Sequence, residues 1–109
     1  MKIEFLYSSR CPNREETLQN LIRVLKRNGW FMGIHSVEIK DLNQAKKAKF
    51  LGSPTIRVNG QDLEKDAEKA GSYSLDCRTY VINGKSVSVP TEDFIEEGIK
   101  RILKNEKTT

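Results

Sequence analysis

The sequence predicts an α/β domain with a mixed sheet flanked by helices, and three observations lead to this prediction. The spacing of apolar residues switches between the strand period and the helix period along the chain. A strand, a helix and a second strand come first, and such a crossover makes its two strands parallel. Two Asn-Gly pairs, at residues 59–60 and 83–84, each follow a run that contains β-branched residues and predict antiparallel hairpins.

The first half of the chain predicts two strands and two helices. Residues 2–7, KIEFLY, predict a strand that is buried on both faces, because apolar side chains fall on both of its sides. From Pro12 a helix of about four turns is expected, with acidic residues in its first turn and basic residues in its last. A second strand is expected at 34–40, followed by a short helix over 43–52 that Gly52 closes.

The second half predicts two hairpins and a final helix. The first hairpin covers residues 53–64 and adds antiparallel strands to the sheet, and an irregular stretch follows over 66–76. The second hairpin, over 77–90, is an addition that precedes the last helix. Thr91 is expected to cap this helix. The apolar residues predicted for its inner face are Phe94, Ile95, Ile99, Ile102 and Leu103.

Length and composition indicate one domain. The chain has 109 residues, 37% of them hydrophobic, which predicts a single domain over residues 1–104 and a frayed tail over 105–109. Such a domain can bury a core without disulfides or metals. The apolar stretch at the amino terminus is too short for a signal peptide, and no run is long enough to span a membrane. We therefore expect a cytoplasmic protein without membrane association, in which cysteines are normally reduced.

The charge pattern argues against nucleic acid as a partner. The net charge is +4 and the sequence pI is about 9.1, which by itself would suit an acidic partner. Lysines and arginines are interleaved with acidic residues, however, and the densest basic stretch is the short KKAK at 46–49. Such interleaving is typical of solvated helix faces.

Cys11 is the first candidate for chemistry, because it lies where the first strand gives way to the first helix. Pro12 suits the first helical position, since its missing N–H would lack a partner there, so Cys11 is expected at the N-cap. Unpaired backbone N–H groups and the helix dipole at that position favour the thiolate, and Arg10 and Arg14 add positive charge. Cys11 is therefore predicted to be a reactive thiol; the alternative is a small buried hydrophobic residue.

These elements and residues resemble the thioredoxin superfamily over most of the chain. In that superfamily a reactive cysteine follows the first strand, and a cis-proline at the start of the third strand lies against it. RCPNR at 10–14 matches the first feature and GSPTIRVNG at 52–60 matches the second. The resemblance implies a three-layer thioredoxin-like fold with a cis bond before Pro54, and it places Ser53, Pro54 and Ser9 in the substrate groove.

The chain departs from that superfamily three residues after Cys11. A second cysteine usually stands there, and here the residue is Arg14, which excludes a local dithiol. If Cys77 comes within bonding distance, Cys11 would attack a disulfide and Cys77 would resolve the mixed adduct. Otherwise Cys77 is an inward-facing strand residue, and Cys11 is a monothiol that needs an external thiol such as glutathione. Protein or small-molecule thiols and disulfides are the expected partners, and no cofactor is predicted.

Three separated segments also resemble a family of short thioredoxin-like proteins, some with selenocysteine and some labelled alkylmercury lyase-like. The segments are CPN at 11–13, FLGSPTIRVNG at 50–60 and YSLDCRTY at 73–80. A second function class is therefore soft-metal or organomercurial handling by two thiolates. Organomercurial lyases use a carboxylate three residues after the first cysteine, where this chain has Arg14, so Asp76 would have to replace it.

A third class is a non-catalytic binding module. In this hypothesis the groove near Ser8, Ser9 and Pro54, together with WFM at 30–32, would hold a peptide. The alternative for WFM is packing in a connection between elements. No metal site is predicted, because His35 is the only histidine and four zinc ligands are hard to assemble around it.

Overall fold

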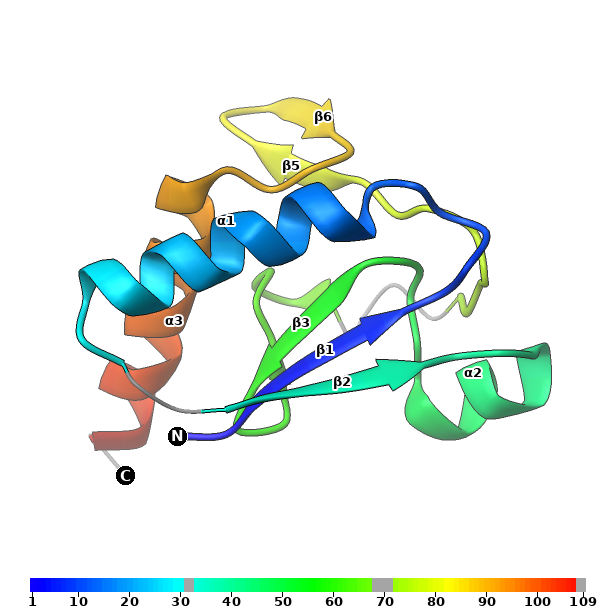
Figure 1. Cartoon of the computed structure of the whole chain (residues 1–109), viewed down its shortest axis with the longest axis horizontal. Helices are drawn as coiled ribbons and strands as arrows, with labels where there is room; N and C mark the ends of the chain where they lie inside the picture. The colour runs from blue at the N-terminus through cyan, green and yellow to red at the C-terminus, as the bar shows by residue number, and fades with distance from the viewer. Residues whose placement is uncertain (31–32, 68–71, 108–109) are drawn as a thin grey trace.

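The computed structural model describes residues 1–30, 33–67 and 72–107 and contains a four-stranded mixed sheet in the order β2-β1-β3-β4 (Figure 1). The sheet and the elements around it are β1 (Ile3–Tyr7), α1 (Arg14–Arg27), β2 (Ile34–Glu38), α2 (Leu42–Ala48), β3 (Thr55–Val58) and β4 (Gln61–Asp62). They are followed by β5 (Tyr80–Ile82), β6 (Lys85–Val87) and α3 (Glu92–Lys107). The predicted α/β class, with an extra hairpin before the last helix, is confirmed.

Strand β1 is the centre of the sheet. It pairs in parallel with β2 and antiparallel with β3, so that Ile3 lies opposite both Ile34 and Val58. Parallel pairing follows from the crossover through α1, and antiparallel pairing from the chain reversing direction before β3. The mixed sheet is therefore the result of two different connections that meet on one strand.

Helices cover both faces of the sheet, as Figure 1 shows with α1 and α3 together on one side and α2 apart from them. The larger core cluster lies between the sheet and these two helices and contains Ile3, Phe5, Leu21, Val24, Leu25, Ile56, Val58, Leu63, Ile95, Ile99 and Ile102. The smaller cluster lies on the α2 side and contains Leu6, Ile39, Ala45, Phe50 and Leu75. Strand β1 contributes to both clusters, which confirms that it is buried on both faces.

Both Asn-Gly turns form as predicted. Asn59 and Gly60 have φ angles of 51° and 82°, and Asn83 and Gly84 have 52° and 78°. Two successive positive φ angles define the turn that matches the twist of a two-stranded hairpin. The β5–β6 hairpin forms its own two-stranded sheet instead of extending the main one.

Thr91 caps α3 as predicted, since the backbone N–H of Phe94 donates to its Oγ1 at 3.2 Å. Ile95, Ile99 and Ile102 are fully buried. The helix runs to Lys107, three residues into the stretch 105–109 that was expected to fray. Residues 108–109 lie outside the described residues.

The predicted start of α1 was wrong by two residues. Pro12 and Asn13 form a turn, and the N-cap of the helix is Asn13, not Cys11. The physical reason is a turn that comes first: the N–H of Cys11 donates to the carbonyl of Ser8 at 3.2 Å, so this segment is still reversing direction. The helical ladder begins only at the carbonyl of Asn13, which accepts from both the N–H and the Oγ1 of Thr17.

The predicted end of α2 was also wrong. The helix ends at Ala48, and Lys49 is its C-cap in the left-handed region, at φ 54° and ψ 44°. This conformation turns the chain so that the N–H of Phe50 reaches the carbonyl of Ala45 at 2.8 Å and its ring enters the smaller core cluster. Burial of Phe50 therefore decides the end of the helix, although Gly52, three residues after the observed C-cap Lys49, was the predicted stop.

Only the first residue of the WFM segment at 30–32 is among the described residues. Trp30 is half-buried and packs against the larger core cluster. Residues 31–32 lie outside the described residues. None of the helices in the described ranges combines the length and the apolar character needed to cross a bilayer.

Candidate functional site

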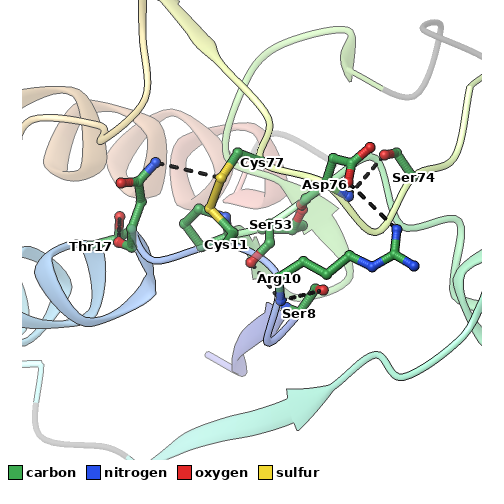
Figure 2. Close-up of a disulfide and its surroundings, with 12 residues drawn as sticks. Ser8, Arg10, Cys11, Thr17, Ser53, Ser74, Asp76 and Cys77 are labelled. Carbon is green, nitrogen blue, oxygen red and sulfur yellow. Dashed lines mark hydrogen bonds and ion pairs between the residues drawn. A yellow bond between two sulfur atoms is a disulfide. The ribbon is translucent and has the colours of Figure 1, made fainter.

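The two cysteines form a disulfide that joins distant parts of the chain (Figure 2). Cys11 follows β1 and Cys77 precedes β5, and their Cα atoms are 5.1 Å apart. This separation is within the usual range for a disulfide. Of the alternatives that the sequence left open for Cys77, pairing with Cys11 is therefore the one found.

The segment that carries Cys11 is folded into a turn whose first and last residues, Ser8 and Cys11, are buried. Besides the bond from Cys11 to the carbonyl of Ser8, the N–H of Ser8 donates to Ser53 Oγ at 3.0 Å, and the N–H of Arg10 donates to Ser8 Oγ at 3.2 Å. Ser8 and Ser53 are both buried, and Cys11 is only 1% exposed. Cys11 is therefore held by the turn that follows β1, and that turn is bonded to Ser53, which lies just before β3.

The segment that carries Cys77 lies beside the same Ser53. Residues Ser53 and Cys77 form an isolated parallel bridge, in which the N–H of Ser53 donates to the carbonyl of Asp76 at 2.9 Å and the N–H of Arg78 donates to the carbonyl of Ser53 at 3.0 Å. Figure 2 shows Ser53 next to the disulfide. One residue therefore contacts both cysteine segments, through its side chain on one side and its backbone on the other.

The residue after Ser53 joins this arrangement. The Ser53–Pro54 peptide bond is cis, and Pro54 is buried. The hydroxyl of Tyr80 donates to the carbonyl of Pro54. Of the three residues that the resemblance placed in a groove, Ser9 is exposed, whereas Ser53 and Pro54 lie in the interior beside the disulfide.

Arg78 anchors the Cys77 segment to the core of the molecule. Its side chain is 6% exposed and forms ion pairs with Asp62 at 2.8 Å and with Glu64 at 3.1 Å. It also donates to Thr55 Oγ1 at 3.2 Å and lies over the ring of Tyr80, 4.2 Å from its centroid. These hydrogen bonds and ion pairs hold the buried guanidinium in place, and the guanidinium in turn fixes the backbone next to Cys77.

Electrostatics keep this anchor in one protonation state. Burial by itself lowers the pKa of Arg78, but Tyr80, Asp62 and Glu64 outweigh it, so the pKa lies above its usual value. Burial raises the pKa of Tyr80, so its hydroxyl stays neutral and remains a hydrogen-bond donor. The anchor is therefore charged, and its aromatic partner uncharged, at any ordinary pH.

The arginines predicted to support a thiolate at Cys11 have other partners. Arg10 forms an exposed ion pair with Asp76 at 3.7 Å, and Arg14 lies over the ring of Tyr7, 4.8 Å from its centroid. The polar side chain that contacts the disulfide is instead Asn13, whose Nδ2 donates to Cys77 Sγ at 3.8 Å. Asp76, the carboxylate that organomercurial chemistry would require, is engaged by Arg10.

Sequence reasoning missed Arg78, its two acidic partners and Asn13. The sequence carried no local signal for Arg78, because an inward-facing Cys77 in a strand would place its neighbour Arg78 on the outer face. Asp62 and Glu64 also line a cavity of about 480 Å³ on the β4 side, which neither cysteine lines. Among the residues that the structure describes, no group of three or more His, Cys, Asp or Glu side chains could hold a metal ion.

A known protein family matches most of the chain. A family model described as "Domain of unknown function (DUF2703)" matches residues 2–99. No curated protein and no solved structure matched the chain. The match includes both cysteines, Ser53 and the Arg78 anchor. The chain therefore belongs to the DUF2703 family.

Proposed function

We propose that this protein is a thiol-disulfide redox protein with a thioredoxin-like fold, which alternates between the Cys11–Cys77 disulfide and the corresponding dithiol. The observation that carries the proposal is the disulfide itself, formed between residues 66 positions apart that meet beside the buried Ser53. Neither cysteine has a second cysteine near it in the sequence. Their approach therefore depends on the fold, as expected for a pair that must find each other repeatedly.

The order of elements supports the thioredoxin-like part of the proposal. A cysteine follows the central strand β1, a parallel β2 follows α1, and an antiparallel β3 begins directly after a cis Ser53–Pro54 bond. The resemblance to that superfamily implied the same order and the same place for the proline. The departure is the second cysteine, which comes from the segment before β5 instead of from the first turn of α1.

The chemistry is a two-electron exchange. The protein disulfide and two thiols of a partner give the protein dithiol and the partner's disulfide, with two protons carried from the partner's thiols to the cysteines. The reverse direction oxidises the partner's dithiol. Protein or small-molecule thiols can take the partner's role, and in the cytoplasm, where we expect this protein, they keep such pairs reduced.

We expect the fold to persist without the disulfide, which would favour a reversible role over a purely structural one. Closing a loop over the 66-residue separation is worth roughly 4 kcal/mol in the chain-entropy account. Two apolar clusters, the α1–α3 contact and the Arg78 anchor include neither cysteine. The reduced protein is therefore expected to stay folded with its thiols close together.

A redox titration tests this proposal. The protein is equilibrated in glutathione buffers of graded ratio, free thiols are alkylated, and the oxidised fraction is measured by mass, while circular dichroism follows folding. We expect a single two-electron transition above about −300 mV, where structural disulfides are still oxidised, with the fold retained throughout. Reduction that occurs only in denaturant, or reduction that unfolds the chain, would contradict the proposal. The Cys11→Ser/Cys77→Ser double variant is the control for folding without either thiol.

A further inference from the structure

We infer that Cys77 is the sulfur that exchanges with the partner and that Cys11 is the resolving sulfur. This assignment rests on the proposed redox function and reverses the roles that the sequence predicted. It follows from the unequal burial of the two cysteines and from the way in which their segments are held.

Accessibility is the first argument. Cys11 is 1% exposed, and its neighbours Ser8 and Ser53 are buried as well, whereas Cys77 is exposed. A thiolate attacks a disulfide at one of its two sulfurs, and access decides which one. The buried sulfur of Cys11 offers no approach to a partner in the oxidised protein. The attack must therefore fall on Cys77 Sγ.

The anchoring of the Cys77 segment is the second argument. The residues on either side of Cys77 are both hydrogen-bonded to Ser53, and Arg78 is fixed further by buried ion pairs. None of these contacts involves a sulfur atom. When the disulfide opens, Cys77 Sγ therefore stays at the surface, close to Cys11, and does not depend on the bond for its position.

The surroundings of the sulfurs suit these roles. Asn13 Nδ2 donates to Cys77 Sγ, so a polar donor lies beside the exchanging sulfur. Cys11 lies two residues before the N-cap of α1, at the positive end of the helix dipole. The thiolate that remains on Cys11 when the bond to Cys77 breaks is therefore buried, but it lies near a helix start and beside the polar residues Ser8 and Ser53.

The exchange then balances in two steps. A partner thiolate attacks Cys77 Sγ, the bond between the two protein sulfurs breaks, and a mixed disulfide forms at Cys77 while Cys11 leaves as a thiolate and takes a proton from solvent. A second partner thiolate attacks the partner's sulfur in the mixed disulfide and releases Cys77 as a thiolate. In the oxidising direction, Cys77 attacks a partner disulfide and Cys11 then displaces the partner from Cys77.

Single-cysteine variants test the assignment. Reduced Cys11→Ser, which retains Cys77, and reduced Cys77→Ser, which retains Cys11, are mixed with glutathione disulfide, and intact mass follows the mixed disulfide over time. We expect Cys77 to react at least about tenfold faster than Cys11, because only Cys77 is accessible. The same measurement in denaturant is the control, in which the two rates should become similar. Equal rates in the folded proteins, or a faster Cys11, would overturn the assignment.

A second measurement uses the wild-type chain, so the test does not depend on the variants folding well. Oxidised protein is exposed briefly to reduced glutathione, quenched with an alkylating agent and mapped by peptide mass. Glutathione on Cys77 with the alkyl group on Cys11 is the expected pattern, and the opposite pattern would overturn the assignment. If the wild-type disulfide does not open at all without denaturant, the redox function itself fails, which is a different outcome from a reversed pattern.

Discussion

The two ends of the disulfide are held by different kinds of interaction. Cys11 is positioned by a turn that closes on Ser8 directly after β1, and this turn is held by one side-chain bond, from the N–H of Ser8 to Ser53 Oγ. Cys77 is positioned by contacts that are distant in sequence, through Ser53 and through Arg78 with its acidic partners. The difference teaches that a pair of thiols can be brought together by two devices, a turn with one side-chain bond on the Cys11 side and backbone bonds with a buried ion-pair cluster on the Cys77 side, and that each device can be weakened separately.

The largest effect is expected from Arg78→Met, which removes the long-range anchor. It leaves Asp62 buried without its counter-charge, so the free energy of unfolding should fall by about 3–5 kcal/mol. Urea denaturation of the oxidised protein measures the loss. The redox midpoint should also move to a less negative potential, because the two thiols no longer face each other when reduced.

Arg10→Met is the matched control for that prediction. Arg10 pairs with Asp76, the acidic residue directly before Cys77, but the side chains of this pair are 66% and 76% exposed. An exposed pair of this kind contributes at most about 1 kcal/mol. Similar losses in the two variants would show that Arg78 does not anchor the Cys77 segment.

A smaller effect is expected from Gly52→Ala, which adds a methyl group against Arg78, the residue that anchors the Cys77 segment. A Cβ at this position would lie 2.8 Å from Arg78 Cβ and 3.1 Å from the carbonyl oxygen of Asp76, and the φ angle is 131°. Both the contact and the backbone conformation disfavour alanine, so we expect a loss of about 2–3 kcal/mol in the free energy of unfolding.

Gly84→Ala separates the two causes. Gly84 has a positive φ of 78° but no atom within 4 Å of an added Cβ, so only the backbone cost of about 1 kcal/mol applies. Urea denaturation of both variants gives the comparison. If Gly52→Ala costs no more than Gly84→Ala, the close approach of residue 52 to the Cys77 segment does not restrict this position.

The smallest of the three main effects is expected from Ser53→Ala, which weakens the Cys11 side alone. The buried N–H of Ser8 loses its acceptor, at a cost of about 1–2 kcal/mol, while the backbone bonds of Ser53 to the Cys77 segment remain. In a Cys77→Ser background, alkylation of Cys11 should become faster, because its turn opens more often.

The exposed Ser9→Ala is the control for Ser53→Ala, and its stability should stay within about 0.5 kcal/mol of the wild type. An unchanged alkylation rate of Cys11 in Ser53→Ala would mean that the bond from Ser8 does not hold the turn. A change in the rate of Cys77 instead, measured in the Cys11→Ser background, would contradict the separation of the two devices.

Much of the fold was predictable because local chemistry decides it. The two Asn-Gly turns formed because asparagine and glycine tolerate positive φ angles, and Thr91 capped α3 because its hydroxyl reaches the third N–H of the helix. The apolar pattern of β1 was enough to predict burial on both faces. In these places, neighbouring residues contain all the information that the structure uses.

The helix boundaries near the site were less predictable, for a physical reason. Pro12 is compatible with a helix start and equally with the turn that it occupies, and the bond from Cys11 to Ser8 selects the turn. Lys49 adopts a left-handed conformation that its sequence does not favour, because Phe50 must enter the core. Tertiary packing overrides local preference at both points.

The sequence by itself determined the α/β class, the hairpins, the last helix and the candidacy of Cys11, since each depends on periodicity or on turn and cap chemistry between near neighbours. Only the tertiary structure decided that Cys77 lies within bonding distance of Cys11, that Cys11 is the buried member of the pair, and that Arg78 anchors the segment that carries Cys77. The reason is that these features depend on how the segment after β1 and the segment before β5 meet at Ser53, and contacts across such long sequence separations leave no local pattern.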